Sequence, residues 1–155
     1  MRRVVFDCMI FLQAAARSTG PAGALLELAE NGTIQLVVSV EILDEIGYVL
    51  RRPELITNFK SLTPQLVDEF LSRLQICSET VEPVPKVFVY ERDPKDEKYV
   101  NLAIASKSDV LVSRDKDILS LRDQNSPLRM AFGDQLKLQI LDPVELLQIL
   151  RQENA

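Results

Sequence analysis

Apolar residues recur along this chain with two periods, which predict strands that alternate with helices. Short runs that are β-branched or alternate apolar with polar residues predict strands at residues 3–6, 34–38, 109–112 and 136–141. Apolar positions three or four residues apart predict helices at residues 22–30, 39–52, 63–76, 96–106 and 142–150. The alternation of the two element types favours a parallel sheet wrapped by helices.

Residue types typical of helix ends mark several of these boundaries. Asn31-Gly32 is a helix stop signal. The predicted helix starts are Ser39 as an N-cap, Thr63 followed by Pro64, and Asp142 with Glu145 in a capping pattern.

Two features of the chain interrupt the simple alternation. The helices at 39–52 and 63–76 have no strand between them, which predicts a helical arm projecting from the sheet. Residues 122–135 have the composition of a long connecting loop, mobile and able to cover a site or form an interface. With 155 residues and no repeat or linker, we expect one domain over residues 1–155.

Composition and charge narrow the classes of function. Apolar residues make up 46% of the chain and charged residues 26%, which is typical of a soluble globular protein. No apolar run approaches the roughly 18 residues of a membrane span, and Asp7 interrupts the N-terminal run, so we expect a cytoplasmic protein without a signal peptide. A formal charge of −5 argues against a general nucleic-acid coat, but a nuclease with an acidic metal site is compatible with it.

The chain contains no histidine, which excludes Ser-His-Asp and Cys-His nucleophile systems and zinc sites built on histidine. Cys8 and Cys77 lie among apolar residues without the spacing of a metal site, so we expect them to be reduced core residues. Catalysis by this chain must therefore use carboxylates, hydroxyls, amines or a bound cation.

Four acidic residues are expected to meet at one edge of the sheet. Asp7 directly follows the strand at 3–6, in the stretch VVFDCMIF, and Asp115 follows the strand at 109–112, in VLVSRDKD. Asp96 begins a predicted helix, and Glu45 lies near the second turn of the helix after the strand at 34–38. Because ligands of open α/β sheets bind outside the carboxyl ends of strands, these positions predict a site there.

Such a cluster needs a cation. Two carboxylates about 5 Å apart repel by roughly 3 kcal/mol at an effective dielectric near 20, so several together require compensation. Because the ligands are all oxygen, Mg²⁺ or Mn²⁺ is favoured over zinc, and such an ion can activate water and neutralise a phosphate. The basic residues that flank two of the acids, and are placed to hold a phosphodiester backbone, are Arg92, Lys95, Lys98, Arg114 and Lys116.

Each acid also has a plain structural interpretation. Asp96 fits an N-cap, with or without a metal, and Asp115 fits a turn or cap residue. Glu45 fits a solvated residue or an ion pair with Arg51 or Arg52. We interpret Asp93 and Asp117 mainly as surface or outer residues of the site.

The ordered set of motifs resembles the PIN-domain family over roughly residues 3 to 150. In order along the chain, the motifs are VVFDCMIF with Asp7, LVVSVEILDEI with Glu45, DPKDEKYVNLAIAS with Asp96, and VLVSRDKD with Ser113 and Asp115. The stretches RDPKDEKYVNLA and ILDPVELL are most similar to the branch of toxins from toxin–antitoxin systems, which includes VapC-type proteins.

This resemblance implies a three-layer α/β/α fold with a central parallel sheet. It also implies a Mg²⁺- or Mn²⁺-dependent endoribonuclease, with Asp7, Glu45, Asp96 and Asp115 in the acidic positions and Ser113 orienting the last acid or a metal-bound water. Proteins of this branch are often homodimers, and a cognate antitoxin holds the toxin inactive.

One departure from the family pattern opens an alternative. Where the family usually has Asn two residues after the first Asp, this chain has Met9, which offers only a weak thioether acceptor. The alternative is a degenerate, non-catalytic PIN domain that acts as a binding module. A third reading, a phosphatase with a nucleophilic Asp, is disfavoured because the second Asp expected two residues later is absent.

Overall fold

The computed structural model describes residues 1–154. Within this range, the chain forms a five-stranded sheet in the order β3-β2-β1-β4-β5, and every pair of neighbouring strands is parallel. The strands are β1 (Arg2–Phe6), β2 (Ile34–Val38), β3 (Ser78–Thr80), β4 (Val110–Val112) and β5 (Gln139–Leu141).

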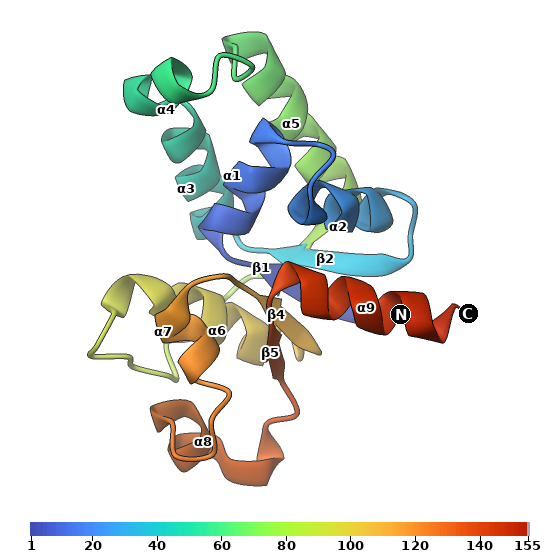
Figure 1. Cartoon of the computed structure of the whole chain (residues 1–155). Helices are drawn as coiled ribbons and strands as arrows, with labels where there is room; N and C mark the ends of the chain where they lie inside the picture. Colours follow the sequence, from blue (N-terminus) through green and yellow to red (C-terminus); the bar gives the residue numbers. More distant parts are fainter. Residues whose placement is uncertain (155) are drawn as a thin grey trace.

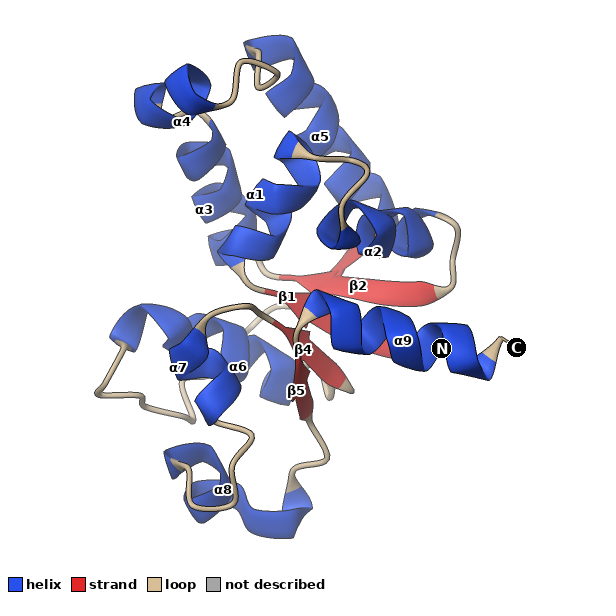
Figure 2. Cartoon of the chain, viewed as in Figure 1, coloured by secondary structure: helices blue, strands red, loops and turns tan. Residues whose placement is uncertain are grey.

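Helices cover both faces of the sheet, so the predicted three-layer α/β/α fold is confirmed (Figures 1 and 2). In Figure 1 the first five helices lie above the sheet and the next three lie below it, while α9 packs against α2. The helices are α1 (Cys8–Ala16), α2 (Pro21–Glu30), α3 (Val40–Leu50), α4 (Pro53–Asn58), α5 (Pro64–Cys77), α6 (Glu97–Ala105), α7 (Lys116–Ser120), α8 (Pro127–Phe132) and α9 (Pro143–Glu153). Short 3₁₀ turns occupy η1 (Pro94–Asp96) and η2 (Gly133–Gln135).

The predicted periodicities correspond to real elements. The strand at 34–38 has the predicted bounds, whereas β5 keeps only the last three residues of 136–141. Ser39 and Thr63 cap their helices through side-chain oxygens, and Asp142 with Glu145 forms a complete capping box. Figure 1 shows α3, α4 and α5 extending from the sheet, as expected for the helical arm.

Several elements had no clear signal in the sequence. The predicted loop at 122–135 is wrong, because it contains α8, which is capped by Ser126, and the turn η2. Helix α1 was not predicted, since CMIFLQAAA is apolar almost throughout and lacks a clear period. The three residues of β3 are polar and mostly exposed, so no alternation marks them.

The central strands are buried on both sides, as is usual for parallel sheets covered by helices. Val4, Val5 and Phe6 of β1 have no exposed surface. Among residues 1–154, no helix is long and apolar enough to cross a membrane.

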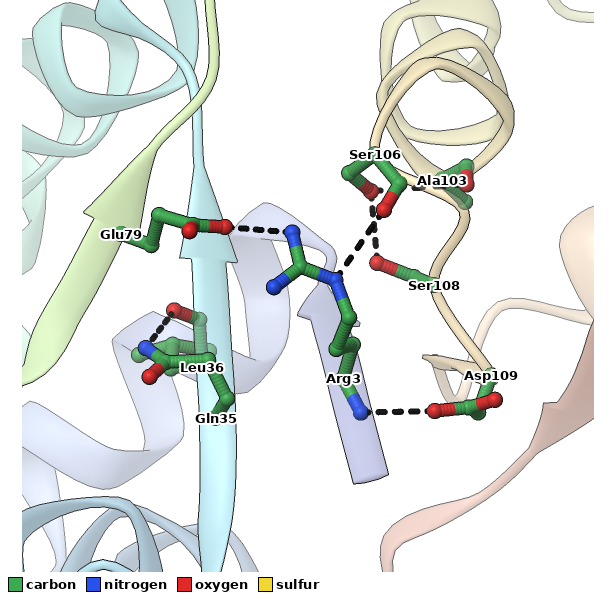
Figure 3. Close-up of polar contacts among 8 residues, drawn as sticks. All are labelled: Arg3, Gln35, Leu36, Glu79, Ala103, Ser106, Ser108 and Asp109. Atoms are coloured by element: carbon green, nitrogen blue, oxygen red, sulfur yellow. Dashed lines mark hydrogen bonds and ion pairs between the residues drawn. The ribbon is translucent and has the colours of Figure 1, made fainter. Parts of the chain in front are cut away.

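Arg3 ties together several elements near the beginning of β1 (Figure 3). Its backbone N–H donates to Asp109 Oδ2 at 2.8 Å, and its Nε donates to the carbonyl oxygen of Ser106 at 3.1 Å. Its guanidinium also pairs with Glu79 of β3. These contacts hold the edge strand and the end of α6 to β1, at the end of the strand opposite to Asp7.

Candidate metal centre

The predicted acids lie where β1 and β4 end side by side. Crossovers from β1 to β2 and from β3 to β4 pass on opposite faces of the sheet. The switch point between β1 and β4 is therefore the position at which open α/β sheets have their ligand crevice. Phe6 pairs with Val112 in the ladder, and the next backbone N–H, that of Asp7, donates to the carbonyl oxygen of Val112 at 3.1 Å. This register brings the residues that follow the two strands together.

Asp7 is buried and held by hydrogen bonds from neutral groups. Only 3% of the surface of Asp7 is exposed. Ile10 N–H donates to Oδ1 at 3.0 Å, which makes Asp7 the N-cap of α1, and the hydroxyl of Ser113 donates to Oδ2. Burial raises the pKa of Asp7 to about 6, and the negative charge of Asp115 acts in the same direction, while the hydrogen bonds oppose the shift. The protein therefore pays a desolvation cost to keep Asp7 here.

Ser113 links the first acid to the last. The hydroxyl that donates to Asp7 also accepts a hydrogen bond from the backbone N–H of Asp115 at 2.9 Å. Asp115 in turn caps α7, because its Oδ1 accepts from the N–H groups of Asp117 at 2.7 Å and Ile118 at 3.3 Å. Asp115 is therefore a helix cap, as one interpretation of the sequence predicted. Both cap hydrogen bonds go to Oδ1, so the other oxygen, Oδ2, takes no part in the cap.

Asp93, Asp96 and Asp115 form an aspartate triad. One carboxylate oxygen from each lies within 4.8 Å of the other two. Asp96 is only 9% exposed, and its buried Oδ2 has no hydrogen-bond partner among the described residues. Burial raises the pKa of Asp96 to about 7, and the charges of Asp93 and Asp115 add to this effect.

The expectation that Asp96 caps its helix was wrong. Asp96 makes no side-chain cap, because the 3₁₀ turn η1 precedes α6 and Asp96 already has helical dihedrals, φ −89° and ψ −10°. Its carboxylate is consequently free of the helix end and lies in the triad. Asp93, which we expected among the surface or outer residues of the site, is half-buried beside Asp96.

Glu45 lies in a separate set of contacts next to the triad. Tyr99 donates its hydroxyl to Glu45 Oε1, and Lys98 Nζ lies 2.6 Å from Oε2. The expected partners were Arg51 and Arg52, but Arg51 pairs with Asp68 and Arg52 lies over the Tyr48 ring. Both oxygens of the Glu45 carboxylate are therefore already engaged, Oε1 by a hydrogen bond and Oε2 by an ion pair.

Tyr99 and Cys8 are site residues that the sequence interpretation missed. Burial, and then Glu45, raise the pKa of Tyr99, so its hydroxyl remains protonated and is a donor. Burial and Glu45 also raise the pKa of Cys8 to about 12, which keeps this thiol protonated. Cys8 and Cys77 are both free, as expected, but each is half-buried and not fully in the core. The position of Tyr99, one helical turn after Asp96, was the signal available.

Two of the five flanking basic residues are engaged by acids in this structure. Arg92 pairs with Asp117 at 3.1 Å, and Lys98 pairs with Glu45. The other three, Lys95, Arg114 and Lys116, are exposed. These three are therefore available to a phosphate without first breaking an ion pair.

The donor set fits a hard divalent cation. The unpartnered buried Oδ2 of Asp96 is an acceptor that a protein normally satisfies, and neighbouring carboxylates provide further oxygen ligands. The candidate donors are all carboxylate oxygens, a donor type that suits Mg²⁺ or Mn²⁺.

The chain is similar to known proteins both in sequence and in structure. The family profile described as PIN domain matches residues 3–117. Uncharacterized protein MJ1680 of Methanocaldococcus jannaschii is 30% identical over 155 residues, covering 94% of this chain and 90% of that protein. The crystal structure of VapBC2 from Rickettsia felis bound to a DNA fragment from their promoter matches with a TM-score of 0.49 and 19% identity, covering 89% of this chain and 98% of the other.

Proposed function

Because the chain belongs to the PIN domain family, we propose that it is a Mg²⁺- or Mn²⁺-dependent endoribonuclease that hydrolyses RNA phosphodiester bonds at the carboxylate cluster. Members of this family are generally nucleases, and those nucleases generally use divalent metals. The observation that carries the proposal is the buried, unpartnered Oδ2 of Asp96 in the aspartate triad, at the crevice between β1 and β4.

We assign the metal site to Asp7, Glu45, Asp96 and Asp115, with Ser113 as the residue that orients two of them. The Ser113 hydroxyl joins Asp7 Oδ2 to the backbone N–H of Asp115, so the first and last acids keep a fixed relation. The Glu45 carboxylate contacts the Tyr99 hydroxyl and the Lys98 ammonium, and the latter would compete with a cation for it.

The proposed reaction is hydrolysis of a phosphodiester by water. A bound divalent cation lowers the pKa of water and neutralises charge on the phosphate. The carboxylates accept a proton from the attacking water, whose oxygen bonds to phosphorus as the bond from phosphorus to the leaving sugar oxygen breaks. The proton finally resides on that sugar oxygen. Exposed Lys95, Arg114 and Lys116 would hold the neighbouring phosphates.

We further propose that the chain, one PIN-like domain over residues 1–155, is the toxin component of a cytoplasmic toxin–antitoxin system. The order of the acidic motifs, and the stretch RDPKDEKYVNLA in particular, supports this assignment. On this proposal a cognate antitoxin protein holds the nuclease inactive, and the nuclease is a homodimer.

The proposed function is tested by measuring metal binding and RNA cleavage on the same set of proteins. We expect Mn²⁺ to bind the native protein in calorimetric titrations, and fluorescently labelled single-stranded RNA to be cut in Mn²⁺ or Mg²⁺ but not in EDTA. Asp7→Asn and Asp115→Asn should abolish both binding and cleavage while circular dichroism stays native. Cleavage that survives either substitution in a folded protein would refute the proposed site.

The alternative is a degenerate PIN domain that binds a partner without cutting RNA. It is favoured by Met9, which is 54% exposed on the first turn of α1, two residues after Asp7, and provides no hydrogen-bond donor there. This alternative predicts no cleavage by the native chain, and activity only in a Met9→Asn variant. Cleavage by the native chain that EDTA removes would exclude it.

A further inference from the structure

The aspartate triad contains an acid outside the four assigned to the metal site. Asp93 is three residues before Asp96, and an oxygen from each lies within 4.8 Å of one on Asp115. At about 5 Å and an effective dielectric near 20, each like-charged pair costs roughly 3 kcal/mol. A third ionised carboxylate at this position therefore favours the folded chain only if a cation binds beside it.

A second observation marks the triad as a ligand site. The Asp96 side chain is buried to more than nine-tenths, its Oδ2 has no partner among the described residues, and it lies in the triad with Asp93 and Asp115. Buried oxygens of this kind are nearly always bonded, so this atom points to a ligand at the triad. That ligand must be a cation or a donor, because its neighbours are carboxylates.

Glu45 differs from Asp93 in this respect. The Glu45 carboxylate is bonded through both oxygens, by the Tyr99 hydroxyl and by the Lys98 ammonium at 2.6 Å. Lys98 neutralises much of the charge that Glu45 would contribute to a cation. Among residues 1–154, Asp93 forms no ion pair, and neighbouring Arg92 pairs with Asp117.

The loop before α6 is fastened so that Asp93 is held in place. Glu97 Oε2 accepts from the backbone N–H of Tyr90 at 2.8 Å, and Lys86 lies 3.1 Å from Glu97 Oε1. The carbonyl oxygen of Asp93 accepts from the N–H of Asp96 at 3.1 Å, which closes the 3₁₀ turn. These bonds fix the backbone on both sides of the Asp93 side chain.

We propose that Asp93 is a further ligand of the divalent cation, and that it contributes more to cation affinity than Glu45 does. This inference rests on the proposed function only in that the cluster holds a cation. Asp93, Asp96 and Asp115 would then hold the cation together, and it would satisfy Asp96 Oδ2.

Calorimetric titration with Mn²⁺ alone tests the inference without a nucleic-acid substrate. We expect Asp93→Asn to weaken Mn²⁺ binding by at least about tenfold, and Glu45→Gln to weaken it less. Glu91→Gln is the matched control, because Glu91 is an exposed acid of the same loop and should leave the affinity within about twofold of native. Thermal melts of each variant verify folding.

The outcomes separate this inference from the proposed function. If native protein and Asp93→Asn bind Mn²⁺ equally well, or if Glu45→Gln loses more affinity than Asp93→Asn, the assignment of Asp93 is wrong while the metal site stands. If folded native protein binds no Mn²⁺, both fail.

A second variant tests for direct contact with the metal. Asp93→Cys places a thiol where the carboxylate stood, and Cd²⁺ should then produce a thiolate–cadmium absorption band stronger than that of native protein, whose Cys8 is nearby. A spectrum unchanged from native would show that position 93 does not touch the metal.

Discussion

Asp7 and Asp96 are both buried acids at the same crevice, but their surroundings give them different properties. Asp7 receives hydrogen bonds on both oxygens, from Ile10 N–H and from the Ser113 hydroxyl. Asp96 has one buried oxygen without any partner. Because an unsatisfied acceptor costs more than a satisfied one, Asp96 has more to gain from a cation. We infer that Asp7 shapes the site and that Asp96 faces the metal most directly.

Ser113→Ala tests the link between the two strands. Losing this hydroxyl leaves Asp7 Oδ2 and the Asp115 N–H without their shared partner, so we expect the free energy of unfolding to fall by about 1–3 kcal/mol. Mn²⁺ affinity should fall by roughly tenfold, as for other residues that orient metal ligands. Chemical denaturation and calorimetry provide the two measurements. Ser61→Ala, at an exposed position, is the control, and native Mn²⁺ affinity in Ser113→Ala would contradict the orienting role.

Lys98→Met is expected to change Mn²⁺ affinity in the opposite direction. Methionine keeps the linear stem but removes the ammonium that pairs with Glu45, so repulsion of a nearby divalent cation disappears and the Glu45 carboxylate is released. We expect Mn²⁺ to bind several-fold more tightly in calorimetric titrations. Lys95→Met, which removes an exposed lysine of the same segment, is the control. Weaker binding in Lys98→Met would mean that Lys98 organises Glu45 as a ligand and does not compete with the metal.

The residue types of the site were predictable from the sequence, but not all of their orientations. The acids after β1 and β4 follow from where the strands end, so Asp7 and Asp115 could be placed. Asp93 and Asp96 lie in one short polar segment, and whichever turn begins α6 decides where each points. Nothing in the local pattern distinguishes a capped start from the 3₁₀ turn that is observed, so Asp93 was placed on the outside.

At the scale of elements, the clearest feature is that the backbone of the loop at residues 87–88 is hydrogen-bonded to a side chain. Asn101 of α6 accepts from the N–H groups of Val87 at 3.0 Å and Phe88 at 2.8 Å, and it donates to the carbonyl oxygen of Phe88 at 3.0 Å. The asparagine thus does for this extended segment what a neighbouring strand does in a sheet. Its burial, at 3% exposed, makes these bonds costly to lose.

Asn101→Ala should therefore loosen the loop that leads to Asp93. We expect a loss of about 2–4 kcal/mol in the free energy of unfolding, because three bonds to buried or half-buried groups disappear. Hydrogen exchange at residues 86–91 should accelerate, and Mn²⁺ affinity should fall with it. Asp142→Ala, which removes the cap of α9, is the control that lowers stability by about 1 kcal/mol without changing Mn²⁺ affinity. Unchanged exchange at 86–91 would contradict this role of Asn101.

Elements with strong periodicity or clear caps were predictable, and the others were not. Helices α3 and α5 combine an apolar stripe with capping residues, and both were found with nearly the right bounds. The short elements α4, α7 and α8 depend on caps and on tertiary packing more than on a period. A five-residue helix such as α7 has too few positions to display one.

At the scale of the whole molecule, the strand order decides what the carboxylates can do. A parallel sheet follows from the alternation of elements, but the order β3-β2-β1-β4-β5 depends on long-range pairing that no local pattern encodes. With β1 in the centre, Asp7 lies beside the residues that follow β4. Part of the negative charge behind the formal net charge of −5 therefore lies together at the ends of β1 and β4, where a bound cation would offset it.

The stability of the metal-free protein should consequently fall as pH rises from about 5 to about 8. An unfolded Asp has a pKa near 3.8, whereas burial raises the pKa of Asp7 to about 6 and that of Asp96 to about 7. In this window the folded protein binds more protons than the unfolded chain, so the free energy of unfolding decreases with pH, by on the order of a few kcal/mol. Glu30, Glu97 and Glu153 have lowered pKa values and act in the opposite direction, but their contribution is complete by about pH 5.

Denaturant unfolding across this pH range, with EDTA and with excess Mn²⁺, measures the effect. Mn²⁺ should remove most of the decline, because a cation that binds only the folded state stabilises it most where the carboxylates are ionised. Asp7→Asn should flatten the EDTA curve, since its neutral amide no longer loses a proton on titration. A stability that stays level or rises from pH 5 to 8 in EDTA would mean that the buried acids are compensated within the protein itself, and the case for a cation at the aspartate triad would lose its electrostatic basis.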